Sequence, residues 1–438
     1  MASTYLTRSI TSTNSSWTFS AWCKRSGLTS TQYLVSWGGS GTGQGIGFSS
    51  SDRLQHYSES VSSNPTSSAQ FRDISGWYHV VVRNNAGTIT LYVNGVALSN
   101  TGGNTGSALI STTLRIGEWK TNQYRWDGSM SHINFTDGTA YDASAFGETD
   151  STTGEWKIIT APSVTYGSDG FFILKDGNSL TDQSGNGNNF TLGGGTLTKT
   201  EDCPSNVFNT MSPLSSAYFD SQYTFAHGNT YVEGNNTNNW KLPIPGTLAA
   251  IKGKYYWEVK QSPGSHTDYN IFGFAKANGY WNDATSYSNG AQNSIQTAAA
   301  ATVTVYGQTG THSNYVKISG SAVSITDNDI VSFALDLDNR KCWLAKNGVW
   351  VDDDSGNTNG SSINSSYPLW NTDDITADTF YTPVSVQYYD PQCYYNFGNG
   401  YFGNTAVSSA GTNASNNGIF EYDVPSGFTA LSTKGLNI

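Results

Sequence analysis

TITLYVNGVAL, residues 88–98, and KCWLAKNGVWV, residues 341–351, share one pattern: an apolar-rich run, an Asn-Gly pair and a second short run. The two pairs are Asn94-Gly95 and Asn347-Gly348. Asn-Gly favours a type I′ turn, because both central residues need positive φ and the twist of this turn matches that of the flanking strands. Each stretch is therefore predicted to form a β-hairpin.

The separation of the two hairpins shows whether they are repeats of one unit. The distance along the chain from Asn94 to Asn347 far exceeds the period of about 20–50 residues that is typical of solenoids and propellers. The stretches around the two hairpins also differ from each other. We therefore expect one hairpin solution used in two different domains.

The composition favours a protein made almost entirely of β-strands. Aromatic residues make up 13% of the 438 residues, with 13 Trp and 26 Tyr, whereas charged residues make up only 13%. Aromatic and β-branched side chains fit a pleated, half-buried surface, and the 47 Gly, with many Ser and Asn, fit tight turns. The length allows two or three domains.

Charge and hydropathy exclude several classes of partner. The net charge is −11 and no cluster of Lys and Arg occurs, so nucleic acid is not expected as a partner. No apolar run is long enough to span a bilayer, so membrane insertion is not expected. The first ten residues, MASTYLTRSI, lack the apolar core of a signal peptide. We expect a chain that stays in the cytoplasm where it is made or leaves it by a route without such a signal.

The four cysteines lack the spacing of a metal site. Cys23, Cys203, Cys342 and Cys393 lie far apart, and no Cys-x-x-Cys pair is present. Buried free thiols are the expectation, since free cysteine is among the most often buried residues. Two disulfides are the alternative.

Short runs with a strand-like pattern recur along most of the chain, separated by turn residues. The first group is SWTFSAWCK (16–24), YLVSWG (33–38), GIGFSS (45–50), WYHVVVR (77–83), TITLYV (88–93) and TLRIGEW (113–119). The second group is KYYWEVKQ (254–261), NIFGFAK (270–276), DIVSFALDLDN (329–339), KCWLAKN (341–347), TPVSVQYY (382–389) and CYYNFG (393–398). Such spacing indicates sandwiches or barrels. The predicted organisation is a β-sandwich over 1–160, a connector with a strand or hairpin segment over 161–214, and a second β-sandwich over 215–438.

Both halves are similar to known families. WTFSAWCKRSG, GWYHVVVRNNAGTITLYVNGVAL, TLRIGEW and WDGSMSHINF resemble the laminin-G-like branch of the concanavalin A-type jelly rolls, over about residues 1–140. KYYWEVKQ, NIFGFAKANGYW, DIVSFALDLDNRKCWLAKNGVW and FYTPVSVQYYDPQCYYNFGNGYF resemble the SPRY sandwich. These resemblances imply an all-β chain with two antiparallel jelly-roll β-sandwiches in tandem, joined by an extended connector.

The combination of the two halves resembles virion surface proteins of tailed phages, which are described as tail-fibre or lectin-like. The resemblance implies a non-enzymatic, receptor-binding protein of a tail fibre or tail tip that recognises host-surface glycans. A capsid decoration or spike protein is the alternative, and a polysaccharide depolymerase is the third. It implies other virion proteins as partners and a homo-oligomer, with a trimer expected. The chain begins almost at its first strand, without the long stem of many fibres, which favours a compact tip or a capsid-surface location.

A glycosidase would need two carboxylates about 5 Å apart in a retaining enzyme. On a strand they would lie two or four residues apart, because alternate residues share a face. Glu148 with Asp150 and Asp336 with Asp338 have this spacing, but the full acidic run of a glucanase is missing. We expect solvated carboxylates at both places and no enzyme activity.

One loop has part of a calcium-binding pattern. Asp182, Ser184 and Asn186 stand at the first, third and fifth positions of a calcium loop. The twelfth position is Gly193 in place of the bidentate Glu, so the pattern favours a polar β-turn over Ca²⁺, and no cofactor is expected.

Aromatic residues beside polar turns are the candidate sugar-binding residues. In jelly-roll lectins an aromatic ring lies against the apolar face of a sugar while Asn or Asp reaches its hydroxyls. The candidates are Trp119, Tyr124, Tyr280, Trp281 and Trp370. Alternatively, each of them packs in a core or in an interface, as large aromatics usually do.

Overall fold

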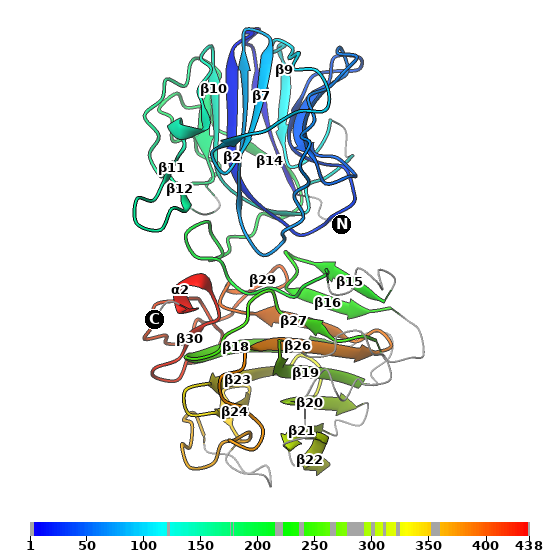
Figure 1. Ribbon diagram of the computed structural model, residues 1–438, viewed down its shortest axis with the longest axis vertical. Helices are drawn as coiled ribbons and strands as arrows, with labels where there is room; N and C mark the ends of the chain where they lie inside the picture. Colours follow the sequence, from blue (N-terminus) through cyan, green and yellow to red (C-terminus); the bar gives the residue numbers. More distant parts are fainter. Residues whose placement is uncertain are drawn as a thin grey trace. The chain divides into compact units, whose positions relative to one another are not determined.

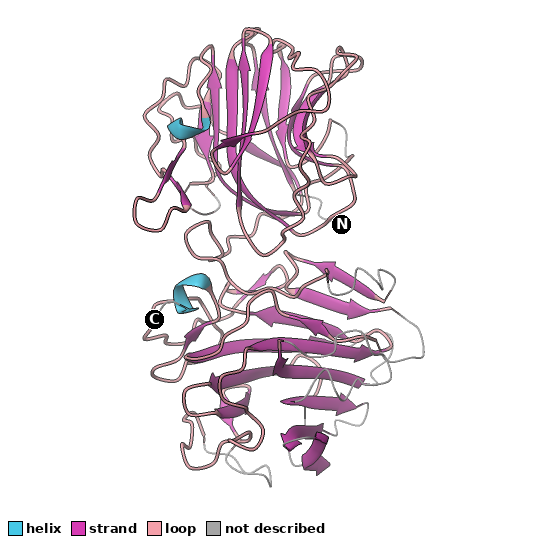
Figure 2. Cartoon of the chain, viewed as in Figure 1, coloured by secondary structure: helices cyan, strands magenta, loops and turns pink. Residues whose placement is uncertain are grey.

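The computed structural model describes residues 4–120, 123–175, 177, 179–214, 222–235, 241–262, 269–277, 293–298, 303–309, 312–320, 325–351 and 360–436. The chain divides into two compact units, Met1–Lys199 with Cys203–Ser205 and Thr200–Asp202 with Asn206–Ile438. In the described part, helix is limited to the 3-10 turn η1 (Ala143–Ala145) and α2 (Thr433–Leu436), and strands dominate both units (Figures 1 and 2). The prediction of an all-β chain with two antiparallel sandwiches in tandem is confirmed.

Two six-stranded sheets form the first unit. Sheet A contains, in spatial order, β14 (Thr191–Gly194), β1 (Tyr5–Ile10), β9 (Thr112–Ile116), β3 (Gln32–Trp37), β4 (Gln44–Phe48) and β5 (Leu54–Ser58). Sheet B contains β13 (Phe171–Ile173), β10 (Gly128–Asp137), β2 (Trp17–Arg25), β6 (Tyr78–Asn85), β7 (Thr88–Val93) and β8 (Val96–Ala97). A separate pair, β11 (Gly147–Thr149) and β12 (Trp156–Ile158), follows η1. These strands pair antiparallel throughout the described part of the first unit.

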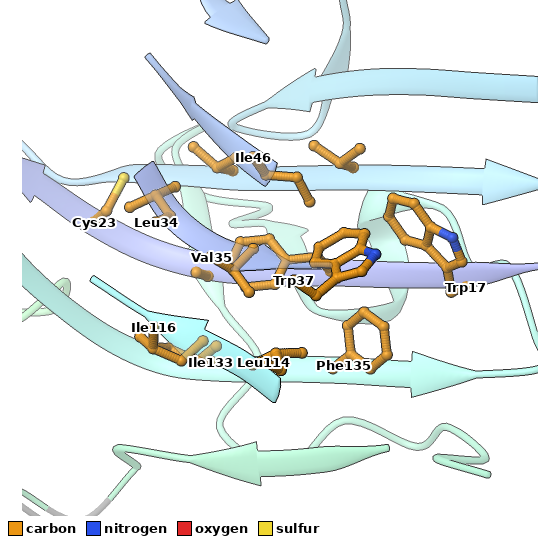
Figure 3. Packing of buried hydrophobic residues seen from close by; sticks show 14 of the residues in the cluster. Trp17, Cys23, Leu34, Val35, Trp37, Ile46, Leu114, Ile116, Ile133 and Phe135 are labelled. Atoms are coloured by element: carbon orange, nitrogen blue, oxygen red, sulfur yellow. The ribbon is translucent and has the colours of Figure 1, made fainter. Parts of the chain in front are cut away.

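The core of the first unit contains a cluster of large aromatic side chains. Trp17 from β2 and Trp37 from β3 meet edge to face with ring centroids 5.3 Å apart, and Phe135 from β10 stacks 6.2 Å from Trp17 (Figure 3). All three side chains are buried. Because strands alternate their side chains between two faces, these residues also fix which faces of the two sheets meet.

The first unit extends past the boundary expected at residue 160. Within 161–214, the segment predicted as a connector, β13 pairs with β10 in sheet B and β14 pairs with β1 in sheet A. The unit therefore runs to Lys199. The sequence predicted a strand or hairpin segment here but not its pairing with the first sandwich, because the partner strands lie far away in the chain.

Two sheets also form the second unit. Sheet C contains β15 (Tyr223–Ala226), β16 (Tyr231–Gly234), β27 (Gln392–Asn396), β18 (Lys254–Ser262), β23 (Ile330–Asp336), β24 (Lys341–Lys346) and β25 (Val349–Trp350), with β30 (Thr429–Ala430) paired in parallel to β18. Sheet D contains β17 (Ile244–Pro245), β26 (Tyr381–Tyr388), β19 (Tyr269–Lys276), β20 (Asn293–Ala298), β21 (Val303–Thr309) and β22 (His312–Gly320). A short hairpin, β28 (Tyr401–Phe402) with β29 (Thr405–Ala406), completes the described strands.

The two Asn-Gly turns have the predicted conformation. Asn94 and Gly95 have φ of 48° and 79°, and Asn347 and Gly348 have φ of 48° and 78°. Each asparagine also holds the neighbouring strand: Asn94 Oδ1 accepts from His79 N and Asn347 Oδ1 accepts from Ile330 N, both at 2.8 Å. The type I′ prediction is confirmed for both hairpins.

The four cysteines all lie in the described part of the chain and are free. Cys23, Cys342 and Cys393 are buried, as predicted, and Cys203 is half-buried. Within the described residues, no helix has the length and hydropathy that crossing a membrane would require.

His56 on β5 is a buried polar side chain without a matching partner. It points into the core between Trp17 and Trp37, with ring centroids 5.5 and 6.4 Å away. Neither ring nitrogen has a hydrogen-bond partner among the described residues, and burial lowers the pKa of His56 to about 3. The ring is therefore neutral in the folded chain.

We predict that His56→Phe raises the free energy of unfolding by about 1 kcal/mol at pH 7, because it removes two unsatisfied buried nitrogens. Since the folded pKa is depressed, the unfolded chain binds the proton first, and stability is lost as the pH falls from about 6.5 towards about 3. The gain from the substitution should thus be larger at pH 4 than at pH 7. Calorimetric unfolding of the full chain at both pH values measures it, and an equal or smaller gain at pH 4 contradicts the prediction.

Candidate functional site

The candidate site lies on the outer face of sheet A, because the outer face of sheet B is covered. On the outer face of sheet B, Val81 and Tyr92 pack against Phe146, and Trp156 donates through Nε1 to His79 Nδ1 at 2.9 Å. On β4 of sheet A, by contrast, the outward positions are Gly45 and Gly47.

Strand register brings small and large residues together on this face. Gly45 pairs with Tyr57 and Gly47 pairs with Gln55, so two glycines stand beside two outward side chains of β5. The alternate residues of β5, including His56, face the core. On this face β4 presents bare backbone at Gly45 and Gly47, and other side chains can lie close to it.

The loop after β9 folds over the bare backbone of β4. Ser36 Oγ donates to Glu118 O at 2.8 Å, Trp119 N donates to Gln123 O at 2.9 Å, and Tyr33 N donates to Tyr124 O at 3.0 Å. These bonds hold the loop against β3. Because two of these bonds involve the backbone atoms of Trp119 and Tyr124, they also fix the positions from which these two side chains extend.

Four aromatic rings gather at this loop. The Trp119 ring lies 4.6 Å from Tyr33 and 5.5 Å from Tyr57 between ring centroids, and Tyr124 lies 6.2 Å from Tyr33. We call Tyr33, Tyr57, Trp119 and Tyr124 the aromatic platform. The structure thus brings together two of the five residues proposed from sequence.

The members of the platform differ in exposure. Trp119 is 5% exposed and Tyr33 is 4% exposed, whereas Tyr124 is 53% exposed. The expectation that Trp119 offers its face to a ligand is therefore wrong: its ring supports the platform from beneath. Tyr124 is the side chain that can stack against a ligand.

Tyr124 also has a strained backbone. Its φ is 48°, in the left-handed region that side chains with a Cβ rarely adopt. Such conformations cost about 1–3 kcal/mol and cluster at functional sites. The hydrogen bond from Tyr33 N to Tyr124 O helps to maintain this conformation.

Charged groups flank the platform. Glu118 is buried and forms ion pairs with Arg115 at 3.0 Å and with Arg125 at 3.7 Å. Lys120 pairs with Glu59 at 2.6 Å and lies 5.5 Å from the Trp119 ring centroid. Desolvation opposes ionisation of Glu59, but hydrogen bonds from Lys120 and the backbone lower its pKa, so this pair stays charged.

The other aromatic candidates are not part of this site. Trp370 is fully buried and exchanges backbone hydrogen bonds with Cys342, and its ring packs 5.5 Å from Phe274 and 6.0 Å from Phe333. Trp370 as a ligand-binding residue is thus corrected to a core residue of the second unit. Tyr280 and Trp281 lie outside the described residues.

The loop with part of a calcium-binding pattern is a hydrogen-bonded turn. The Asp182 carboxylate accepts from Phe172 N, from both N and Oγ of Ser184, and from Asn188 N. Asn186 Nδ2 donates to a backbone carbonyl. Donors thus face Asp182, where a cation would need free oxygens. Within the described residues, no group of three or more His, Cys, Asp or Glu side chains could hold a metal ion.

Three of the four carboxylates considered for hydrolysis, Glu148, Asp150 and Asp336, form ion pairs with lysines. Glu148 and Asp150 both contact Lys157 at 3.3 Å. Asp336 is buried against Lys254 Nζ at 2.9 Å, so the expectation of a solvated carboxylate is wrong for this residue. A general acid needs a raised pKa, but hydrogen bonds lower the pKa of Asp150 and, against desolvation, of Asp336.

Sequence reasoning missed Tyr33, Tyr57 and the two glycines. Alternation alone places Tyr57 on the face opposite His56, and Gly45 and Gly47 alternate in the same way on β4. The signal was thus present in each strand. What was not visible is the pairing of β4 with β3 and β5 that makes these faces continuous.

Residues 2–144 match the profile of a family described as the concanavalin A-like lectin/glucanases superfamily. Solved structures with a similar chain trace include a heptameric pentraxin from Limulus polyphemus (18% identity, TM-score 0.26, covering 32% of this chain and 72% of that one). A candidate carbohydrate-binding protein from Bacteroides ovatus follows (14%, TM-score 0.29, 46% and 61%), as does the PSpry domain of TRIM65 (11%, TM-score 0.30, 43% and 88%). A search of curated proteins finds no match to the chain.

We predict that Gly45→Ala destabilises the first unit by about 1–3 kcal/mol, because overpacking forces neighbouring groups to move. The added Cβ would lie 2.7 Å from Tyr33 Cδ1 and 2.8 Å from Trp119 Cζ3. Hydrogen exchange of the loop backbone should speed up as Trp119 is displaced. Gly39→Ala is the matched control, since its nearest neighbour is 3.8 Å away; equal effects of the two variants would contradict the prediction.

Proposed function

We propose that this chain is a non-enzymatic surface protein of a tailed-phage virion that binds glycans of the host cell through its aromatic platform. Exposed Tyr124 is the observation that carries the proposal. Its ring offers an apolar face to a sugar, and the rings of Tyr33 and Trp119 support it. A pre-positioned aromatic ring loses little conformational entropy on binding.

The groups around Tyr124 supply the polar half of such a site. Gln55 on β5 and Gln123 in the loop are accessible amides, and Lys120 with Glu59 forms a charged pair at the edge. Sites for small polar ligands combine aromatic surface with a few convergent polar groups. The match of residues 2–144 to a lectin and glucanase superfamily agrees with this proposal.

The proposed location is the virion surface, at a tail fibre or tail tip, after synthesis in the cytoplasm of the bacterial host. The partners are a host-surface glycan and other virion proteins, and the proposed assembly is a homo-oligomer, with a trimer as the expectation. This part rests on the resemblance of the two-sandwich chain to phage proteins.

A capsid decoration or spike protein is the second candidate. The burial of Trp119 and Trp370 favours it, because both serve packing and leave fewer exposed rings for ligands. Its sandwiches would then mainly contact other proteins of the particle. A polysaccharide depolymerase is the third candidate, and the lysine-paired carboxylates speak against it.

We predict that Tyr124→Ala weakens glycan binding by at least about tenfold, which corresponds to about 1.4 kcal/mol of lost stacking. A glycan array followed by titration of the bound glycan measures this. Tyr367→Ala is the matched control, because Tyr367 is 54% exposed and belongs to the second unit.

Trp119→Ala should reduce binding together with stability, since Trp119 supports the platform. Binding that survives Tyr124→Ala sinks the platform as the glycan site. New reducing ends after incubation with host polysaccharide would favour the depolymerase.

We predict that antibodies to this chain label the tail of purified particles. The label is located by electron microscopy of gold conjugates, with particles lacking the chain as the control. Label over the capsid faces would replace the receptor-binding proposal by the decoration protein.

A further inference from the structure

A row of side chains crosses the outer face of sheet C. Strand register pairs Asn396 with Glu258, Glu258 with Ser332, Ser332 with Ala345, and Ala345 with Trp350. Paired residues of neighbouring strands point to the same face, so these five residues lie side by side across five strands. All of them are buried, although they face away from the core between sheets C and D.

The small side chain of Ala345 leaves a hollow in this row. A cavity of about 330 Å³ lies over it, with Tyr256, Ser332, Trp350 and Tyr422 among its lining residues. The Asn347-Gly348 turn forms part of its wall. Ligand pockets span roughly 300–1,000 Å³, so this cavity fits a small ligand.

The turn and the C-terminal segment build the cavity together. A Cβ at Gly348 would lie 2.7 Å from Tyr422 Cδ1, so the Tyr422 ring rests directly on the turn. Glu258 Oε2 and Oε1 accept the backbone N–H groups of Glu421 and Tyr422, each at 2.9 Å. This holds the C-terminal segment over the sheet.

The base of the cavity is a chain of hydroxyl groups that ends at a buried carboxylate. Tyr256 Oη lies 2.9 Å from Ser332 Oγ and 3.0 Å from Glu258 Oε1. Asn396 Nδ2 donates to Glu258 Oε2 at 3.0 Å. Burial raises the pKa of Glu258 to about 7, although these donors lower it.

The phenol of Tyr256 has one proton, so the direction of this chain depends on Glu258. When Glu258 is ionised, Tyr256 donates to it and Ser332 donates to Tyr256, so Ser332 offers lone pairs to the cavity. In the described part of the chain Glu258 has four hydrogen-bond partners, and of these only Tyr256 Oη can accept a hydrogen bond from a protonated Glu258. In that state Tyr256 donates its own proton to Ser332, and the Ser332 hydroxyl points its proton into the cavity. Among the described residues, the titratable groups facing Glu258 are Tyr256 on its own strand and Tyr422 in the C-terminal segment.

We propose that this cavity binds a neutral, hydroxylated ligand of about the size of one monosaccharide, with a ligand hydroxyl on Ser332. A hydroxyl group both donates and accepts, so it matches Ser332 in either state of the chain of hydroxyls. Tyr422 and Trp350 supply the aromatic walls. Among the described lining residues, Asp423 is the charged one, so the described lining offers no cation to an anionic ligand. The Asp423 carboxylate already accepts hydrogen bonds from Thr412 N and Oγ1.

The test uses the full chain carrying Tyr124→Ala, so that the aromatic platform does not contribute. Glucose, galactose, mannose and N-acetylglucosamine are titrated separately with saturation-transfer NMR as the readout. At least one of them should bind, and Ser332→Ala should weaken it by about tenfold, the effect of one lost hydrogen bond of about 1.4 kcal/mol. Ala345→Leu should abolish binding by filling the cavity while leaving the hydroxyl chain in place.

Ser385→Ala is the matched control, because Ser385 is a fully buried strand serine of sheet D. It should leave binding unchanged, and thermal unfolding of every variant checks the fold. Affinity should change less than about threefold between pH 6 and pH 8, because a hydroxyl fits both states. Tyr256→Phe removes the hydroxyl that links Ser332 to Glu258 but keeps the ring, and it should lower the affinity. The affinity of this variant should also stay nearly constant between pH 6 and pH 8.

Three outcomes would overturn the proposal: no binding of any of these sugars, binding that survives Ala345→Leu in a folded chain, or binding of choline or inorganic phosphate in their place. Because Tyr124 is already replaced in this background, failure here leaves the proposed function of the first unit unaffected.

Discussion

Strand register is the constraint on which both candidate sites depend. A shift of one residue would turn every side chain of a strand to the opposite face of its sheet. In sheet A, the pairing of Gly45 with Tyr57 brings a bare backbone beside an outward aromatic ring. In sheet C, the two-residue turn at Asn347-Gly348 sets Ala345 opposite Trp350. The Asn347-Gly348 turn, with positive φ at both residues, fixes the second of these pairings, so this hairpin sets the geometry of the cavity.

Small residues on outer sheet faces have opposite consequences in the two units. At Gly45 the missing Cβ lets the rings of Tyr33 and Trp119 lie against β4, and the space is filled. At Ala345 a methyl group stands between Ser332 and Trp350, and the space stays open as a cavity. The filled space supports the exposed ring of Tyr124, whereas the open space is the cavity proposed to bind a ligand. A small residue on an outer strand face thus contributes to the aromatic platform in one unit and to the cavity in the other.

Much of the fold could be predicted from local pattern. Both Asn-Gly hairpins, the strand-rich composition and the two-sandwich organisation are confirmed, because turn chemistry and alternation are local properties. Burial of individual aromatics could not be predicted in this way. Trp119 and Trp370 both stand beside polar turns in the sequence, and both are covered by groups distant in the chain. The assignment of 161–214 to a connector failed for the same reason, since β13 and β14 find their partners far away.

The sequence by itself determined the class of the fold, the positions of the tight turns and the two faces of most strands, because each depends on residues close together in the chain. Only the tertiary structure decided which faces became continuous across strands. It placed Tyr124 over Tyr33, closed Trp370 into a core, and aligned Glu258 with Ser332. These outcomes depend on pairing between distant strands, where non-local hydrogen bonds and packing, and not local preference, set the register.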